Sequence, residues 1–172
     1  GYEIVEQVQD ADIVVVNTCA FIEPAQEEAI DALLDLADLK QQRCKALICT
    51  GCLVQRHGRE LMEQLPEVDG FVGVGAVPRI MEAVEAVLAG QRVFLDSPLT
   101  YVYDGTGPRL HTGAAWLSYL KVADGCDHRC AFCTIPDIRG RYRSVPPALV
   151  ASQLEQMAAD AVSEVCLIAQ DT

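Results

Sequence analysis

Ile13-Val14-Val15-Val16 is a run of four β-branched residues, and such a run predicts a strand buried in a parallel sheet. Two further apolar runs, Ala46 to Cys49 and Phe71 to Val74, predict two more strands of the same kind. Each run is followed by a longer segment with helical periodicity. The first half of the chain therefore alternates strands and helices, which indicates βαβ units.

Three helices are indicated by their start and stop residues and by their apolar stripes. Pro24 opens the first helix, the second runs from about Arg56 to Leu65, and Gly90 ends the third. The stripes of the first and third helices consist of Ile30, Leu33, Leu34 and Ala37, and of Val77, Ile80, Val84 and Leu88. Three strand–helix repeats predict a small three-layer α/β domain over residues 1–95.

Residues 96–115 interrupt this pattern with prolines and glycines, and we expect them to form a linker. The pattern then resumes with a strand over Trp116 to Val122, a cysteine-rich loop, a helix that starts at Pro147, and a strand over Val165 to Ala169. We expect one face of this helix to carry Val150, Leu154, Met157 and Ala161. One β-loop-α-β unit is roughly a quarter of an eight-unit barrel, so residues 116–172 are expected to be the truncated start of a larger domain.

The charge of the chain is strongly acidic and unevenly distributed. It carries 13 basic and 25 acidic residues, a net charge of −12, and residues 1–100 hold 17 of the acids and 7 of the bases. This balance argues against strong nucleic-acid binding through phosphates and favours a basic partner for the first domain.

Composition also restricts the class of protein. Apolar residues make up 51% of the chain, which excludes a disordered protein. No apolar run approaches the roughly 18 residues of a membrane helix, and no charged-then-apolar leader precedes the first strand. We therefore expect a soluble, cytoplasmic protein with no membrane partner.

The chain contains eight cysteines, and their spacing indicates metal ligation rather than disulfides. Disulfide-rich secreted domains are short and poor in core, whereas this chain has long aliphatic segments. Cys126, Cys130 and Cys133 form a CxxxCxxC triplet. A structural zinc ion needs four ligands, whereas an iron–sulfur cube held by three thiolates keeps one iron open. His128 is a conceivable fourth ligand, but we expect it to be an exposed loop residue.

Three arginines follow the triplet, namely Arg139, Arg141 and Arg143. They could hold a carboxylate or a phosphate, or they could be the solvated face of a loop.

The triplet, with Phe132 before its last cysteine and with a strand before it and a helix after it, resembles the radical S-adenosylmethionine superfamily. The resemblance implies that Cys126, Cys130 and Cys133 hold a [4Fe–4S] cluster, whose open iron binds the amino and carboxylate groups of S-adenosylmethionine and whose electron cleaves its sulfonium. It also implies that Phe132 packs beside the nucleoside, and that the second domain begins a partial (β/α) barrel. For the spacing alone, a chance loop and a zinc hook remain alternatives.

Further motifs resemble the methylthiotransferase branch of this superfamily, over nearly the whole chain. They are Asn17-Thr18-Cys19-Ala20-Phe21-Ile22, Thr50-Gly51-Cys52-Leu53, Leu65-Pro66-Glu67-Val68-Asp69, Tyr119-Leu120-Lys121, Ile138-Arg139-Gly140-Arg141 and Ala169-Gln170-Asp171-Thr172. The residues of these motifs are similar to those of the enzymes that methylthiolate an aspartate of small-subunit ribosomal protein twelve. The sister branch modifies an adenosine of transfer RNA.

The branch carries a second [4Fe–4S] cluster on three cysteines at the ends of consecutive strands, and two of these positions match Cys19 and Cys52. The resemblance places the third cysteine upstream, in a first strand that we expect this chain to lack. Cys49 is a conceivable substitute ligand, although we expect Cys44 and Cys49 to be buried or surface thiols and Cys166 to lie in the core.

The resemblance also implies that Gln170 and Asp171, at the end of the last strand, meet the amino group of S-adenosylmethionine; ordinary turn residues are the alternative. It implies a small-subunit ribosomal protein as substrate, with unknown sulfur and electron donors. We assign no catalytic side chain. Two further hypotheses stay open, a transfer RNA methylthiotransferase and a non-catalytic iron–sulfur or zinc module. The fragment itself, without the rest of the barrel, is expected to be inactive.

Overall fold

The computed structural model describes residues 1–103 and 113–171. The chain divides into two compact units, Gly1–Leu99 and Thr100–Thr172, each described below by itself. Residues 104–112, the centre of the expected linker, lie outside the described residues. None of the helices in the described ranges is both long enough and apolar enough to cross a membrane.

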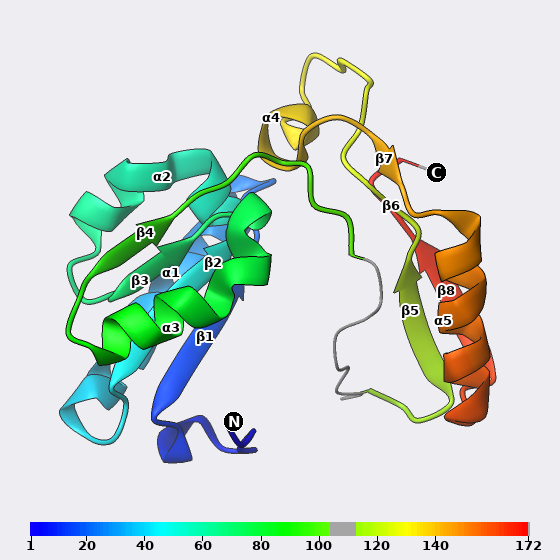
Figure 1. Cartoon of the computed structure of the whole chain (residues 1–172). Helices are drawn as coiled ribbons and strands as arrows, with labels where there is room; N and C mark the ends of the chain where they lie inside the picture. The colour runs from blue at the N-terminus through cyan, green and yellow to red at the C-terminus, as the bar shows by residue number, and fades with distance from the viewer. Residues whose placement is uncertain (104–112, 172) are drawn as a thin grey trace. The chain divides into compact units, whose positions relative to one another are not determined.

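Unit 1 is built on a parallel sheet of four strands (Figure 1). The strands are β1 (Ile13–Thr18), β2 (Ala46–Gly51), β3 (Gly70–Val72) and β4 (Val93–Leu95), and they lie side by side in that order. Each strand pairs in parallel with the next one along the chain, so the carboxyl ends of all four lie at the same edge of the sheet. The strand β4 was not predicted from the sequence.

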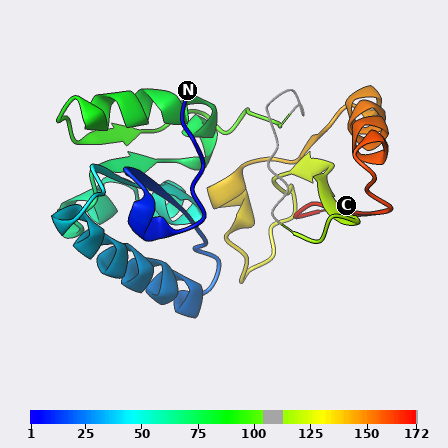
Figure 2. The ribbon, with the colours of Figure 1, turned by 90° about the horizontal axis from the view of Figure 1, so that it is seen from below.

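Helices cover both faces of this sheet, as Figure 2 shows. They are α1 (Glu23–Ala37), α2 (Cys52–Gln64) and α3 (Ile80–Leu88), with short 3₁₀ helices η1 (Val8–Asp10), η2 (Asp38–Gln41) and η3 (Val74–Arg79). Side chains alternate between the two faces along a strand, so Leu47 of β2 packs in the cluster with α1 and α2, whereas Ile48 packs in the cluster with α3. The predicted three-layer α/β arrangement is confirmed.

The structure differs from the expected elements at several places. The strand β1 lies at the edge of the sheet, so Val15 is 46% exposed and the strand is not buried throughout. The helix α2 begins directly at Cys52, with a kink at Gly58, and not near Arg56. In α3 the buried residues are Ala83, Val84 and Val87, whereas Val77 and Leu88 of the expected stripe are exposed.

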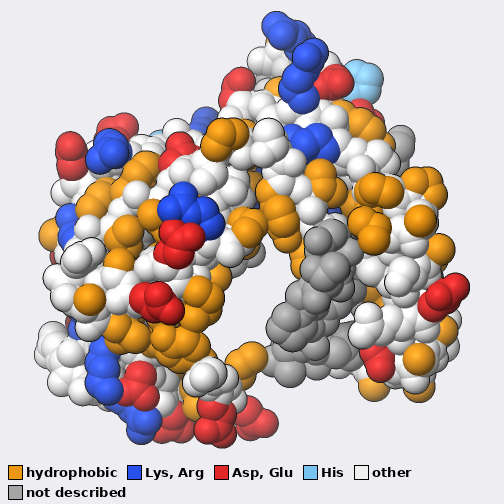
Figure 3. Space-filling model, in the orientation of Figure 1, with side chains coloured by type: hydrophobic (Ala, Val, Ile, Leu, Met, Phe, Trp, Pro, Cys, Tyr) orange, Lys and Arg blue, Asp and Glu red, His pale blue; other side chains and the backbone are white. Residues whose placement is uncertain are grey.

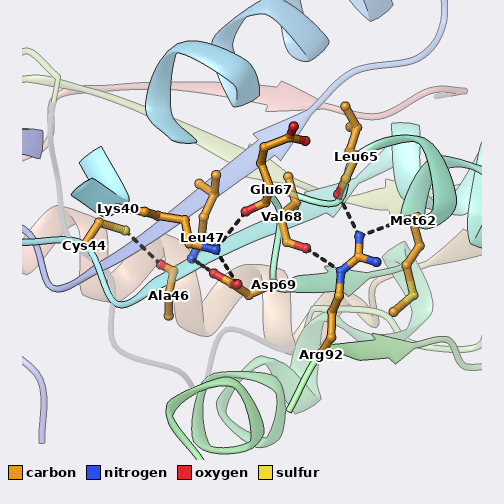
Figure 4. Close-up of polar contacts among 10 residues, drawn as sticks. All are labelled: Lys40, Cys44, Ala46, Leu47, Met62, Leu65, Glu67, Val68, Asp69 and Arg92. Atoms are coloured by element: carbon orange, nitrogen blue, oxygen red, sulfur yellow. Dashed lines mark hydrogen bonds and ion pairs between the residues drawn. The ribbon is translucent and has the colours of Figure 1, made fainter. Parts of the chain in front are cut away.

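The turn between α2 and β3 is fixed by a polar network that the Leu65-Pro66-Glu67-Val68-Asp69 motif forms (Figure 4). The Asp69 carboxylate accepts the N–H of Leu47 at 2.9 Å and pairs with Lys40. Arg92, just before β4, donates to the carbonyl oxygens of Met62, Leu65 and Val68. The last carbonyls of a helix have no partner inside it, so this guanidinium satisfies the carboxyl end of α2.

The described part of unit 2 contains two small sheets and two helices (Figure 1). The strands β5 (Leu117–Lys121) and β8 (Glu164–Ile168) are parallel, and β6 (Ala123–Asp124) and β7 (Arg143–Ser144) are antiparallel. The helices are α4 (Ile135–Arg139) and α5 (Pro147–Ala159).

The inner face of α5 differs from the expected one. Its buried residues are Gln153 and Met157, whereas Leu154 is 36% exposed. Ala161 lies beyond the end of the helix with a φ of 63°, so it does not belong to the face.

Candidate functional site

The three cysteines of the triplet lie on the loop between β6 and α4, and a close backbone contact shuts this loop at its base. Gly125 and Gly140 both have a φ of 75°. The N–H of Cys126 donates to the carbonyl of Gly140 at 3.1 Å. A Cβ at Gly125 would lie 2.6 Å from that carbonyl oxygen and closer still to the carbonyl of Arg141. Position 125 therefore needs glycine for its backbone angle and for the contact.

The loop borders a cavity of about 600 Å³ that the triplet lines. Cys126 and Cys133 are half-buried and Cys130 is exposed. Polar side chains from the loop, from α4 and from the segment after it share the lining, namely Asp127, His128, Arg129, Asp137 and Arg141. Phe132 is 85% exposed, so it does not belong to a core. Figure 3 shows basic, acidic and histidine side chains gathered at this end of unit 2.

The end of β8 reaches the same loop because β5 and β8 pair in register from Leu117↔Glu164 to Lys121↔Ile168. Gln170 accepts the N–H of Gly125 at 3.1 Å through its Oε1. The Oδ2 atom of Asp171 lies 3.7 Å from the Sγ of Cys126 and 3.3 Å from the Nε2 of His128. The structure thus brings both residues from the end of the last strand to the first cysteine of the triplet.

The three arginines after the triplet differ in their ion-pair partners and in whether they line the cavity. Arg139 and Arg143 lie 3.9 and 4.0 Å from the carboxylate of Asp124, a buried residue of β6 that also pairs with Lys121 at 2.7 Å. Only Arg141 of the three lines the cavity, where its Nε lies 3.5 Å from Asp127. The arginines are therefore not one anion-binding cluster, because two of them neutralise a buried acid.

Cys19 and Cys52 lie at the carboxyl edge of the sheet in unit 1. Each follows directly on one member of the register pair Thr18↔Gly51, so the two cysteines continue neighbouring strands. Cys19 is exposed and Cys52 is half-buried at the start of α2. The distance between their Cβ atoms stays a prediction, at roughly 5 to 9 Å for thiolates that share one cluster.

Threonine hydroxyls fix this edge, and their role was not predicted from the sequence. Thr18 donates to the carbonyl of Thr50 at 2.7 Å, and Thr50 donates to the carbonyl of Val72 at 2.9 Å. Gly51 has a φ of 103°, and a Cβ there would lie 2.6 Å from the carbonyl oxygen of Thr18. The recurrence of threonine one or two residues before each cysteine is the sequence signal that could have indicated this bracing.

The other three thiols are Cys44, Cys49 and Cys166. Cys49 has no exposed surface, and burial raises its pKa to about 12, which argues against it as a substitute cluster ligand. Cys44 is also buried, and burial raises its pKa. Cys166, expected in the core, is only half-buried in β8.

The chemistry of the donor set fits an iron–sulfur cluster at the triplet. Three thiols on one short loop face one cavity, and the thiolates of a cube bind different irons, so they need not approach as closely as the ligands of a single ion. Among the described residues, the group of three whose ligand atoms do lie within 4.8 Å of one another is Cys126, His128 and Asp171.

Comparisons with known proteins find a family model and curated relatives that are similar to this chain. Residues 1–73 match the model of the family described as uncharacterized protein family UPF0004. A curated protein of Pelobacter propionicus, ribosomal protein uS12 methylthiotransferase RimO, is 47% identical over 99% of this chain and 38% of its own length. Proteins of the same name from Pelotomaculum thermopropionicum and Myxococcus xanthus are 43% and 42% identical, over 100% and 99% of this chain and 39% and 36% of their own lengths. The chain thus spans less than two-fifths of these relatives.

A solved structure shares the fold. It is the radical S-adenosylmethionine methyltransferase TsrM from Kitasatospora setae, with tryptophan substrate and the analogue aza-SAM bound. Its TM-score is 0.61 at 16% identity, over 92% of this chain and 36% of that one. At this identity the likeness concerns the fold alone. The sequence matches over the whole chain, together with the family model over its first part, show that the chain is similar throughout to the corresponding part of the RimO-type methylthiotransferases.

Proposed function

We propose that this chain is the cluster-binding part of a radical S-adenosylmethionine methylthiotransferase that modifies an aspartate of ribosomal protein uS12. The observation that carries the proposal is the meeting of the end of β8 with the cysteine loop, where Asp171 lies 3.7 Å from Cys126. Residues 45 positions apart in the chain thus meet beside the cavity that Cys126 lines. The names of the relatives support the substrate.

In this proposal Cys126, Cys130 and Cys133 hold a [4Fe–4S] cluster at the cavity. Such a cluster, when bound, supplies an open iron for the amino and carboxylate groups of S-adenosylmethionine and an electron for its cleavage. Asp171 offers a carboxylate to the amino group of the cofactor. Gln170 positions the loop, since its side-chain oxygen already accepts the N–H of Gly125. Phe132, with 85% of its surface exposed, is available to the nucleoside.

We further propose that Cys19 and Cys52 contribute two of three thiolates to a second [4Fe–4S] cluster in unit 1, with the third thiolate from a preceding strand. The domain boundary falls in residues 96–115. Residues 1–100 have 17 acids and 7 bases, and a protein that neutralises ribosomal RNA is basic, so long-range attraction favours the ribosomal protein over free transfer RNA.

Iron analysis of the whole chain after anaerobic reconstitution tests the main cluster. Replacing Cys126, Cys130 or Cys133 by Ala should each remove about four irons per chain, as expected for one cube. Cys166→Ala is the matched control, because Cys166 lies in β8 outside both sets of predicted ligands, and it should keep all the iron. Addition of S-adenosylmethionine should change the electron paramagnetic resonance spectrum of the reduced cluster. Full iron content in the three triplet variants would refute the assignment.

The substrate is tested on a full-length protein that contains this segment. Mass spectrometry after incubation should find a methylthiolated aspartate in uS12 and unmodified transfer RNA. A modified adenosine with unmodified uS12 would move the activity to the sister branch. Loaded clusters with neither product would favour the non-catalytic module.

A further inference from the structure

The group formed by Cys126, His128 and Asp171 has the geometry of ligands around one small ion. Their ligand atoms all lie within 4.8 Å of one another. The carboxylate of Asp171 is central, at 3.3 Å from the His128 ring and 3.7 Å from the Cys126 sulfur. Zinc bonds of about 2.3 Å to sulfur and about 2.0 Å to nitrogen and oxygen, at tetrahedral angles, separate such atoms by about 3.3 to 3.5 Å. The Asp171 carboxylate thus stands to the His128 ring and to the Cys126 sulfur nearly as it would around a zinc ion.

The backbone holds these donors in place without an ion. The N–H of His128 points at the Cys126 sulfur at 3.4 Å, which fixes the turn that carries the histidine. Gln170, the residue directly before Asp171, accepts the N–H of Gly125 at the base of the loop. The His128 side chain is 72% exposed and that of Asp171 32% exposed, so an ion can reach both from solvent.

The donor chemistry selects the class of ion. A thiolate, an imidazole and a carboxylate together suit zinc and its neighbours in the first transition row better than magnesium or calcium, which prefer oxygen ligands alone. Three protein ligands leave a fourth position open, and two of the three, Cys126 and His128, line the cavity.

We propose that Cys126, His128 and Asp171 form a site for a single Zn²⁺-type ion, distinct from the three-cysteine cluster site although it shares Cys126. Cys130 and Cys133 take no part in it. Since both sites use the Cys126 thiolate, zinc and the iron–sulfur cluster compete for the chain. The inference does not depend on the proposed function, because it concerns the chain without its cluster.

Zinc binding to the cluster-free whole chain tests the site, with anaerobic ZnCl₂ titration against a chromophoric chelator. The titration uses the Cys19→Ser/Cys52→Ser double variant, so that zinc bound by these two thiols of unit 1 does not add to the zinc count. We expect one zinc per chain. His128→Ala and Asp171→Asn should each weaken binding by roughly tenfold or more, since even outer-shell partners of a metal are worth about that much. Cys130→Ser and Asp127→Asn, neighbours on the same cavity, should change the affinity less than twofold.

The histidine variant also separates the two proposals. His128→Ala should still take up about four irons on reconstitution, since His128 is not a cluster ligand, and this shows that its loop is intact. Zinc added first should suppress iron uptake in the parent chain and should not in His128→Ala. The site is overturned by the absence of stoichiometric zinc, or by Cys130→Ser weakening zinc as much as His128→Ala does. A failure of the parent to take up iron would count against the proposed function and leave the zinc result standing.

Discussion

The two groups of cysteines depend on different kinds of support. Cys19 and Cys52 continue paired strands of a sheet that has a buried cluster on each face. The triplet lies on a loop closed by the contact of two glycines, in a unit whose buried apolar residues, among those described, are Leu120, Ala123, Ile138, Val145 and Met157. Strand pairing fixes a position through many small contacts, whereas the loop relies on a few. Single substitutions should therefore disturb the triplet more than the strand-end pair.

The glycines at the two sites give the sharpest test of this difference. A left-handed φ costs an alanine about 1 to 2 kcal/mol, and a Cβ forced against backbone adds about 1 to 3 kcal/mol. Gly51→Ala and Gly125→Ala should therefore each lower the free energy of unfolding by about 2 to 5 kcal/mol. Gly90→Ala is the control, because Gly90 has a φ of 80° and no atom within 4 Å of an added Cβ, and it should cost only the backbone part.

Denaturant unfolding followed by circular dichroism gives these free energies, and iron content gives the effect on the triplet. We expect Gly125→Ala to lose the triplet's iron while Gly51→Ala keeps it. The comparison fails if Gly125→Ala binds iron as well as the parent chain does.

A second prediction concerns the stability of unit 1 through Arg92. Arg92→Met keeps most of the volume but leaves the carbonyls of Met62, Leu65 and Val68 without their charged donor, which should cost about 2 to 3 kcal/mol. Arg59→Met is a matched control, since Arg59 lies over the Phe94 ring at 5.1 Å and its loss should cost only about 0.5 kcal/mol. Urea unfolding distinguishes them, and equal costs would show that the guanidinium contributes only packing.

Much of unit 1 was predictable because its strands and helices are long enough for their periodicity to appear in the sequence. β4 was missed because three residues, Val93–Leu95, show no period of their own. The exposure of Val15 follows from the place of β1 at the edge of the sheet, and strand order is a long-range property. The start of α2 at Cys52 depends on the backbone angle of Gly51.

At the candidate site the spacing predicted the loop but not its surroundings. Asp171 meets Cys126 only because β5 pairs with β8, and no local pattern encodes that pairing. Arg139 and Arg143 pair with Asp124 because this acid is buried in a strand of two residues, whereas Arg141 pairs with Asp127. Such contacts are tertiary, so sequence periodicity does not reveal them.

The third prediction tests how well unit 2 is packed. Gln153 of α5 is buried, and neither atom of its amide has a partner among the residues that the structure describes. Burying an amide without hydrogen bonds costs free energy, so Gln153→Leu should stabilise the chain by about 1 kcal/mol. Gln156→Leu, on the exposed side of the same helix, should change stability by less than about 0.5 kcal/mol. A loss of stability in Gln153→Leu would show that the amide has a partner.

The smallest expected effect contrasts a thiol inside the sheet with one at its edge. Burial raises the pKa of Cys49 from its ordinary 9.0 to about 12, so folding favours the protonated thiol. The stability that this provides is fully present below pH 9 and is lost as the pH rises from 9 towards 12, because the unfolded chain ionises first.

At pH 9 the unfolded thiol is half ionised, which corresponds to a loss of about 0.4 kcal/mol relative to pH 7. Cys49→Val lacks the ionisable group, so the difference in unfolding free energy between the two chains should shift by this amount between pH 7 and 9. In the native chain iodoacetamide should label the exposed Cys19 and leave Cys49 unmodified. Equal labelling of the two thiols would mean that the sheet opens readily at its centre, and the contrast between a braced sheet and a loosely held loop would then be lost.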